Sequence, residues 1–169
     1  VQALWASEPR AAECLRPAAR EHVLPTGAMH LVFRLSGPPL RLFDGEQDLV
    51  GRSAGGHALV GGPRERFYVR DVSHTCASVG VLLRPGAALP LLGAPADALA
   101  GRHTPLDDLW GLEAGLAMER LQEASGLEAR LDAFEGLLLE RLADSFHGLH
   151  PAVAQSLAPL GLGALRVRD

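Results

Sequence analysis

In the sequence TCASVGVLL, at residues 75–83, small or aliphatic side chains occupy every second position. These alternating positions are Thr75, Ala77, Val79, Val81 and Leu83. A period of two is typical of a β-strand that buries one face. The segment therefore predicts a half-buried strand of an antiparallel sheet.

Residues 29–35, with the sequence MHLVFRL, show the same alternation further upstream. One face carries apolar side chains, and the other carries His30, Val32 and Arg34. Three more short apolar runs lie between these segments, at residues 40–43, 57–60 and 66–72. Turns rich in Gly and Pro separate the runs. Short strands at this spacing predict an antiparallel β-sandwich or a small barrel.

The pattern becomes helical after residues 84–86. The clearest helix is predicted over residues 127–146, where an apolar stripe contains Leu127, Leu131, Phe134, Leu138 and Leu142. A shorter helix is expected over residues 112–124, with a stripe of Leu112, Leu116 and Leu121. Thr104 and Asp107 have the spacing of a capping box and predict a helix start between them. The fold class is therefore α+β, with a β-rich part at residues 1–86 and a helical annex at residues 87–148.

Composition and charge restrict the functional classes. The 169 residues are 47% hydrophobic and 21% charged, as in ordinary globular domains. No apolar run reaches the roughly 18 to 20 residues of a membrane-spanning helix, and charges at the N-terminus argue against a signal peptide. Cys14 and Cys76 have no metal-binding or disulfide spacing, so we expect free thiols and a cytoplasmic protein. A net charge of −4 without a basic cluster predicts that this chain alone does not hold DNA tightly.

Motifs for catalysis and metal binding are weak. Residues 51–55, GRSAG, match the G-x-S-x-G motif of serine hydrolases, but the glycines at 55–56 block the helix that must follow the nucleophile. We therefore expect no catalytic role for Ser53 and no enzyme activity. The seven histidines have no H-x-H or H-E-x-x-H spacing, so no metal or cofactor is expected. A composite site made from distant histidines stays open.

Two sets of residues are candidates for recognition. The candidate ligand-binding set is His30, Arg34 and Tyr68. An arginine inside a barrel mouth suits an anionic ligand, and the alternative is that Arg34 lies on a solvated face. The candidate dimer interface is Leu131, Phe134, Leu137, Leu138 and Leu139. The alternative for this stripe is packing against the core of its own domain.

Six short stretches follow one another in a distinctive order. Three lie upstream, with the sequences LPTG at 24–27, LVF at 31–33 and VGGP at 60–63. Three lie downstream, with the sequences VGVLLRPGAA at 79–88, LLGAPAD at 91–97 and TPLDDLWG at 104–111. As a series they resemble the N-terminal regulatory domain of AraC-type bacterial transcriptional regulators, over about residues 20–145.

The resemblance implies a cupin-like β-barrel or sandwich that senses a small-molecule effector, forms a homodimer, or does both. It also implies that promoter DNA is contacted only through a C-terminal helix-turn-helix domain, which this chain lacks. Residues 149–169 are then expected to be a linker and the truncated start of that domain. The alternative is a cupin-fold enzyme or a stand-alone small-molecule-binding protein, and a third hypothesis is a ligand-free oligomerisation module. Convergent polar groups in a pocket would favour sensing, and a packed interior would favour the structural module.

Overall fold

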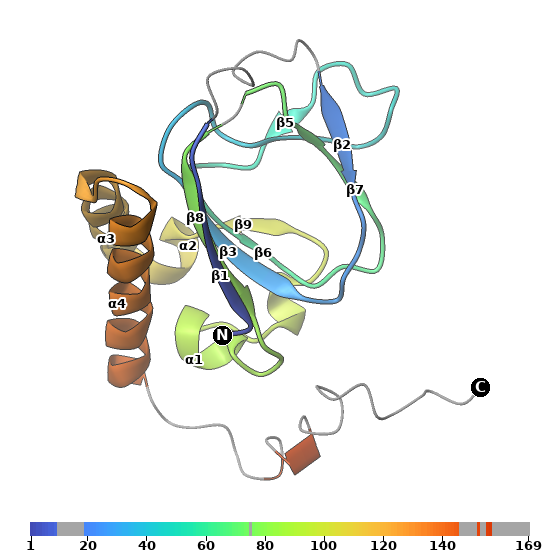
Figure 1. The fold of residues 1–169 in the computed structure, drawn as a ribbon. Helices are drawn as coiled ribbons and strands as arrows, with labels where there is room; N and C mark the ends of the chain where they lie inside the picture. Colours follow the sequence, from blue (N-terminus) through green and yellow to red (C-terminus); the bar gives the residue numbers. More distant parts are fainter. Residues whose placement is uncertain (10–18, 75, 146–151, 153–154, 157–169) are drawn as a thin grey trace.

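The computed structural model describes residues 1–9, 19–74, 76–145, 152 and 155–156. It is an α+β structure with two antiparallel sheets that face each other (Figure 1). The first sheet has the order β1 (Ala3–Ser7), β8 (Ser78–Leu83), β3 (Met29–Arg34), β6 (Ala58–Gly61) and β9 (His103–Pro105). The second has the order β2 (Arg20–Val23), β7 (Tyr68–Asp71), β4 (Arg41–Phe43) and β5 (Arg52–Ser53).

The helices lie on the outer side of the first sheet (Figure 1). They are α1 (Ala88–Leu92), a 3-10 turn η1 (Asp97–Leu99), α2 (Asp107–Trp110), α3 (Leu112–Glu123) and α4 (Leu127–Ser145). Among the described residues, no helix is both long and apolar enough to cross a membrane. The linker predicted at residues 149–169 falls almost entirely outside the described part of the chain, as does Cys14.

All five predicted apolar runs contain a strand. The alternation predicted for residues 29–35 is confirmed, because Met29, Leu31, Phe33 and Leu35 are buried while the residues between them are partly exposed. The expected capping box is wrong. Thr104 pairs with Val60 in β9, and α2 begins at Asp107 with no side-chain cap, because pairing with β6 prevails over the local helix signal.

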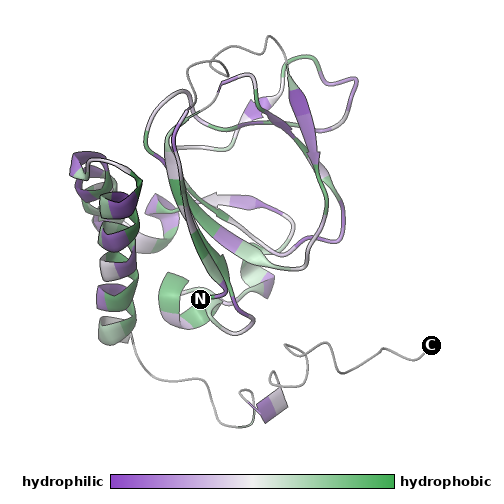
Figure 2. Ribbon diagram, viewed as in Figure 1, coloured by the Kyte–Doolittle hydropathy of each residue, from purple (hydrophilic) through white to green (hydrophobic). Residues whose placement is uncertain are grey.

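The main apolar core lies between the first sheet and the helices. Phe33 of β3 and Phe134 of α4 are fully buried and make an edge-to-face contact with ring centres 5.8 Å apart. Leu138, one helical turn after Phe134, is also buried. Figure 2 shows the green of apolar residues gathered around β8 and α1, and the purple of polar residues along β2 and β7.

This core corrects two assignments of interface residues. The helix predicted over residues 127–146 is confirmed as α4, but Phe134 and Leu138 are 0% and 2% exposed within one chain and have no surface for a partner. Leu131 and Leu137 are partly buried against the same core, and Leu139 is 61% exposed. The stripe expected on α3 is wrong in two of its three members, because Leu112 and Leu116 face solvent while Leu121 is buried as expected. Two alanines of α3, Ala114 and Ala117, fill the core beside Leu121.

The inner face of the first sheet, which looks toward the second sheet, differs in character. Leu59 of β6 packs there with Leu42 and Tyr68 of the second sheet in a small apolar cluster. On β3, however, the inner face presents His30, Val32 and Arg34, all partly exposed. The larger apolar core therefore lies outside the pair of sheets, and the space between them holds both the small apolar cluster and partly exposed polar side chains.

Candidate functional site

A row of three residues crosses the inner face of the first sheet. His30 of β3 pairs with Gly61 of β6, and Gly61 pairs with His103 of β9. The imidazole of His30 lies over Gly61, where an added Cβ would come within 2.3 Å of its Cε1 atom. The two histidine rings thus approach to 6.1 Å between their centres. The missing side chain at Gly61 is what allows this approach.

The second sheet and a connecting segment complete the site. The Tyr68 ring of β7 meets the His103 ring edge-on, with centres 4.8 Å apart. Arg64, between β6 and β7, holds its guanidinium 4.7 Å above the Tyr68 ring and places Nη2 2.8 Å from His103 Nδ1. Arg70 lies two residues after Tyr68, on the same face of β7. We call these five residues, His30, Arg64, Tyr68, Arg70 and His103, the inter-sheet cluster.

Burial and positive charge keep both histidines neutral. Burial, with the nearby Arg70 and Arg64, lowers the pKa of His30 to about 4. Burial, followed by Arg64 and by His30 itself, lowers the pKa of His103 to about 3. Burial also raises the pKa of the Tyr68 hydroxyl, which therefore stays protonated at neutral pH. Burial, together with repulsion from Arg52, lowers the pKa of Arg64, while the coulombic effect of Tyr68 raises it.

The hydrogen bond between Arg64 and His103 fixes the tautomer of the imidazole. A guanidinium nitrogen can only donate, so Nδ1 of His103 must accept and its proton must sit on Nε2. Within the described part of the chain, Nε2 of His103 is buried without a hydrogen-bond partner, and so is Nε of Arg64. Buried polar atoms nearly always have partners. The cluster therefore holds two donors without acceptors.

The structure brings together only part of the predicted ligand-binding set. His30 and Tyr68 belong to the inter-sheet cluster. Arg34 lies on the same face of β3, but its Nε donates to the Pro38 carbonyl oxygen, 3.3 Å away. Arg64, Arg70 and His103 were missed by the sequence reasoning, because His103 reaches the site only through the pairing of β9 with β6. The sequence signal that could have pointed to Arg64 is the VGGP stretch directly before it, which contains the glycine that pairs with His30.

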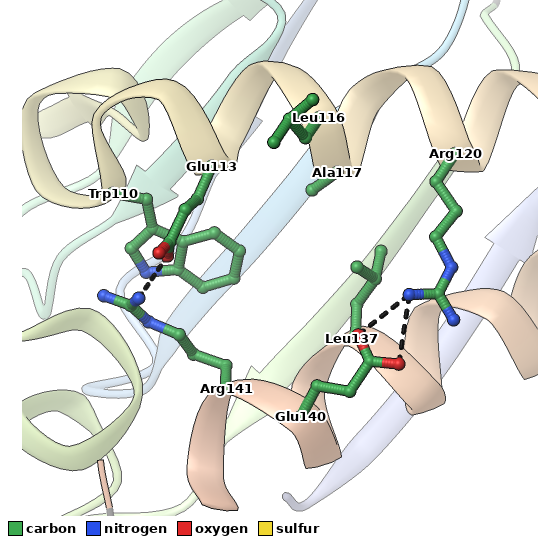
Figure 3. Close-up of a pocket in the computed structure, with 8 residues that line it drawn as sticks. All are labelled: Trp110, Glu113, Leu116, Ala117, Arg120, Leu137, Glu140 and Arg141. Atoms are coloured by element: carbon green, nitrogen blue, oxygen red, sulfur yellow. Dashed lines mark hydrogen bonds and ion pairs between the residues drawn. The ribbon is translucent and has the colours of Figure 1, made fainter. Parts of the chain in front are cut away.

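A second candidate is a groove of about 260 Å³ between α3 and α4 (Figure 3). Two ion pairs span it: Arg120 with Glu140 at 2.8 Å, and Arg141 with Glu113. The four charged side chains are thus matched within the chain, although Nε of Arg141 has no hydrogen-bond partner among the residues that the structure describes. Internal pairing leaves this groove less suited than the inter-sheet cluster to a charged ligand.

Ser53 and the metal-ligand geometry give no further site. Ser53 is exposed in β5, and its hydroxyl accepts a hydrogen bond from the Gly55 amide at 3.3 Å. Within the ranges that the structure describes, no three His, Cys, Asp or Glu residues gather closely enough to hold a metal ion.

The fold and the cluster define a class of protein: an α+β domain whose two facing antiparallel sheets enclose histidine, arginine and tyrosine side chains. The chain belongs to the family described as Domain of unknown function (DUF6597), whose model matches residues 1–105. That match spans every strand of both sheets and all five cluster residues. Neither the curated proteins nor the solved structures include a match to this chain.

Proposed function

We propose that this chain is the sensing and dimerisation domain of an AraC-type transcriptional regulator, and that its effector binds at the inter-sheet cluster of a cupin-like barrel. One observation carries the proposal: polar side chains from β3, β7, β9 and the segment after β6 converge between the sheets, with donors left unpaired. A packed structural module would fill this space with apolar side chains instead.

The sequence series that resembles AraC-type regulatory domains supports the same assignment. Its VGGP stretch contains Gly61 and leads directly to Arg64, and its TPLDDLWG stretch follows directly on His103. The residues that carry the resemblance therefore flank the residues that build the site. Effector binding would act on the regulator through the difference in its affinity for two states of the protein.

The proposal is tested with the complete gene that encodes this chain. Two helix-turn-helix units should follow residue 169, and the complete protein should bind its own promoter region in a fluorescence anisotropy assay, whereas this chain alone should not. An effector should change that affinity in the wild type and have at least a tenfold weaker effect in His103→Asn. A gene without DNA-binding units, or an effector response unchanged in His103→Asn, would contradict the proposal.

A further inference from the structure

We infer that the inter-sheet cluster binds the acidic group of a small organic molecule, either a carboxylate or a phosphoryl group. The inference deepens the proposed function, on which it rests, by naming the chemistry of the effector. It depends on which atoms of the cluster lack partners and on the charges that surround them.

The unsatisfied atoms are donors. His103 presents the N–H of Nε2, because its Nδ1 already accepts from Arg64. Arg64 presents the N–H of Nε, which has no acceptor within the described residues. Tyr68 adds a protonated hydroxyl, and its ring lies against the side chains of His103 and Arg64. Such a set of donors is completed by a ligand that supplies acceptor oxygens.

The charges favour an anion. Arg64 makes no ion pair with any carboxylate that the structure describes, and it contacts a neutral histidine and a tyrosine ring instead. Arg70 is paired with Glu21 at 2.7 Å, and the glutamate is about half exposed at 49%. A partly buried guanidinium without a counter-charge is unfavourable, and a carboxylate or phosphoryl oxygen compensates it through charge-assisted hydrogen bonds.

The same arrangement disfavours other ligands. A cation would meet Arg64 and Arg70, and no group of metal-ligating side chains lies among the described residues to receive it. A neutral ligand would satisfy the donors but would leave the charge of Arg64 without compensation. An acidic group satisfies the donors and also compensates the charge of Arg64.

The test uses this chain with five probes: acetate, benzoate and inorganic phosphate as anions, and acetamide and benzamide as neutral counterparts. Binding is followed by the NMR signals of the His30 and His103 imidazoles and by the melting temperature. Anions should shift the His103 signal saturably and raise the melting temperature, while the amides should do neither. Comparison of benzoate with phosphate identifies the preferred acidic group.

Variants of the cluster locate the binding. Arg64→Gln should weaken anion binding at least tenfold, Arg64→Lys should weaken it less, and Arg66→Gln, at an exposed position of the same segment, should leave it unchanged. If Arg64→Gln does not fold, Arg64→Lys and Tyr68→Phe serve the same purpose. Amides that bind as well as the anions, or anion binding that Arg64→Gln leaves intact, would overturn the inference.

The outcomes separate this inference from the proposed function. Amide binding that shifts the His103 signal would refute an anionic ligand and still support a sensing site between the sheets. If no probe shifts either imidazole signal, the anion inference is wrong. The proposed function is then judged by the effector response of the complete regulator on DNA, which does not depend on these probes.

Discussion

At the scale of single residues, His103 combines features that are individually unfavourable. The residue is 9% exposed, its Nε2 has no hydrogen-bond partner among the described residues, and its Nδ1 accepts from a cation. Unsatisfied buried groups reduce stability, and they are kept where a function needs a preorganised group. The neutral imidazole of His30 shares this environment. Under the proposed function, stability and ligand recognition therefore oppose each other at this site.

The lowered histidine pKa values predict that the protein loses stability in mild acid. In the unfolded chain these imidazoles take up protons near pH 6.5, whereas the folded protein resists protonation down to about pH 4 at His30 and about pH 3 at His103. The free energy of unfolding is therefore fully retained above pH 6.5 and falls as the pH drops, by ~1.4 kcal/mol per pH unit for each histidine. Urea unfolding at pH 7, 6 and 5 measures the slope.

Substitutions assign that slope to the cluster. His30→Asn and His103→Asn should each remove roughly half of the pH dependence between pH 6.5 and pH 5. His74→Asn, at an exposed position, controls for replacing a histidine as such. Equal slopes in the wild type and in His103→Asn would show that the imidazole is charged or solvated in the folded state.

Gly61 is predicted to be essential for the packing of the histidine pair. A Cβ at this position would clash with the His30 ring, so Gly61→Ala should lower the free energy of unfolding by ~1–3 kcal/mol. Gly115→Ala is the matched control, because a Cβ added at that position of α3 meets no described atom within 4 Å beyond its chain neighbours and the adjoining helix backbone, and it should stabilise by up to ~1 kcal/mol. Thermal unfolding measures both.

A double variant checks the cause. If the clash with His30 is responsible, His30→Ala should restore most of the stability lost in Gly61→Ala. Strictly additive losses in the double variant would mean that Gly61 is needed for another reason.

At the scale of secondary-structure elements, α4 serves the core of its own chain. Phe134→Ala should lower the free energy of unfolding by ~3–5 kcal/mol, because it leaves a cavity against Phe33. Glu135→Ala, at an exposed position of the same helix, should change it by less than ~0.5 kcal/mol. Chemical denaturation of both variants provides the comparison. A Phe134→Ala protein of unchanged stability would contradict the packing described for α4.

The elements that could be predicted from the sequence are those with a strong period of their own. Residues 29–34 alternate in burial, residues 78–83 bury Val79, Val81 and Leu83 at every second position, and α4 has a regular apolar stripe. Strand β2, with the sequence REHV, and strand β9, with the sequence HTP, have no such pattern. They exist because their backbones pair with β7 and β6, and pairing between distant segments is not encoded locally. The prediction that Leu112 and Leu116 face the core was wrong for a related reason. Small alanines on the other face of α3 allow that face to pack closely against the core instead.

At the scale of the whole molecule, the two faces of the first sheet have different environments. The outer face buries aliphatic side chains under the helices, and the inner face offers polar groups toward the second sheet. His30 and Tyr68 could be predicted as candidate residues because they lie in strands whose apolar runs are recognisable in the sequence. Arg64 and His103 could not, because their meeting depends on how the sheets face each other.

The proposed homodimer is predicted to use exposed leucines of α3 and α4. Leu112, Leu116 and Leu139 are 91%, 65% and 61% exposed, which is costly for a free surface and useful at an interface. The wild-type chain should sediment as a dimer at micromolar concentration, and Leu116→Glu with Leu139→Arg should give a folded monomer. A monomeric wild type, or a double variant that remains dimeric, would exclude these residues as the interface.

The most direct test of the site is the protonation state of His103 in the free chain, measured by long-range ¹H–¹⁵N NMR of the imidazole. The geometry predicts a neutral ring at pH 7, with the proton on Nε2, Nδ1 unprotonated, and no titration until the pH approaches about 3. Arg64→Gln should release this tautomer and raise the pKa of His103. A proton on Nδ1 at pH 7, or titration of His103 near pH 6.5, would contradict the hydrogen-bond geometry described for the inter-sheet cluster.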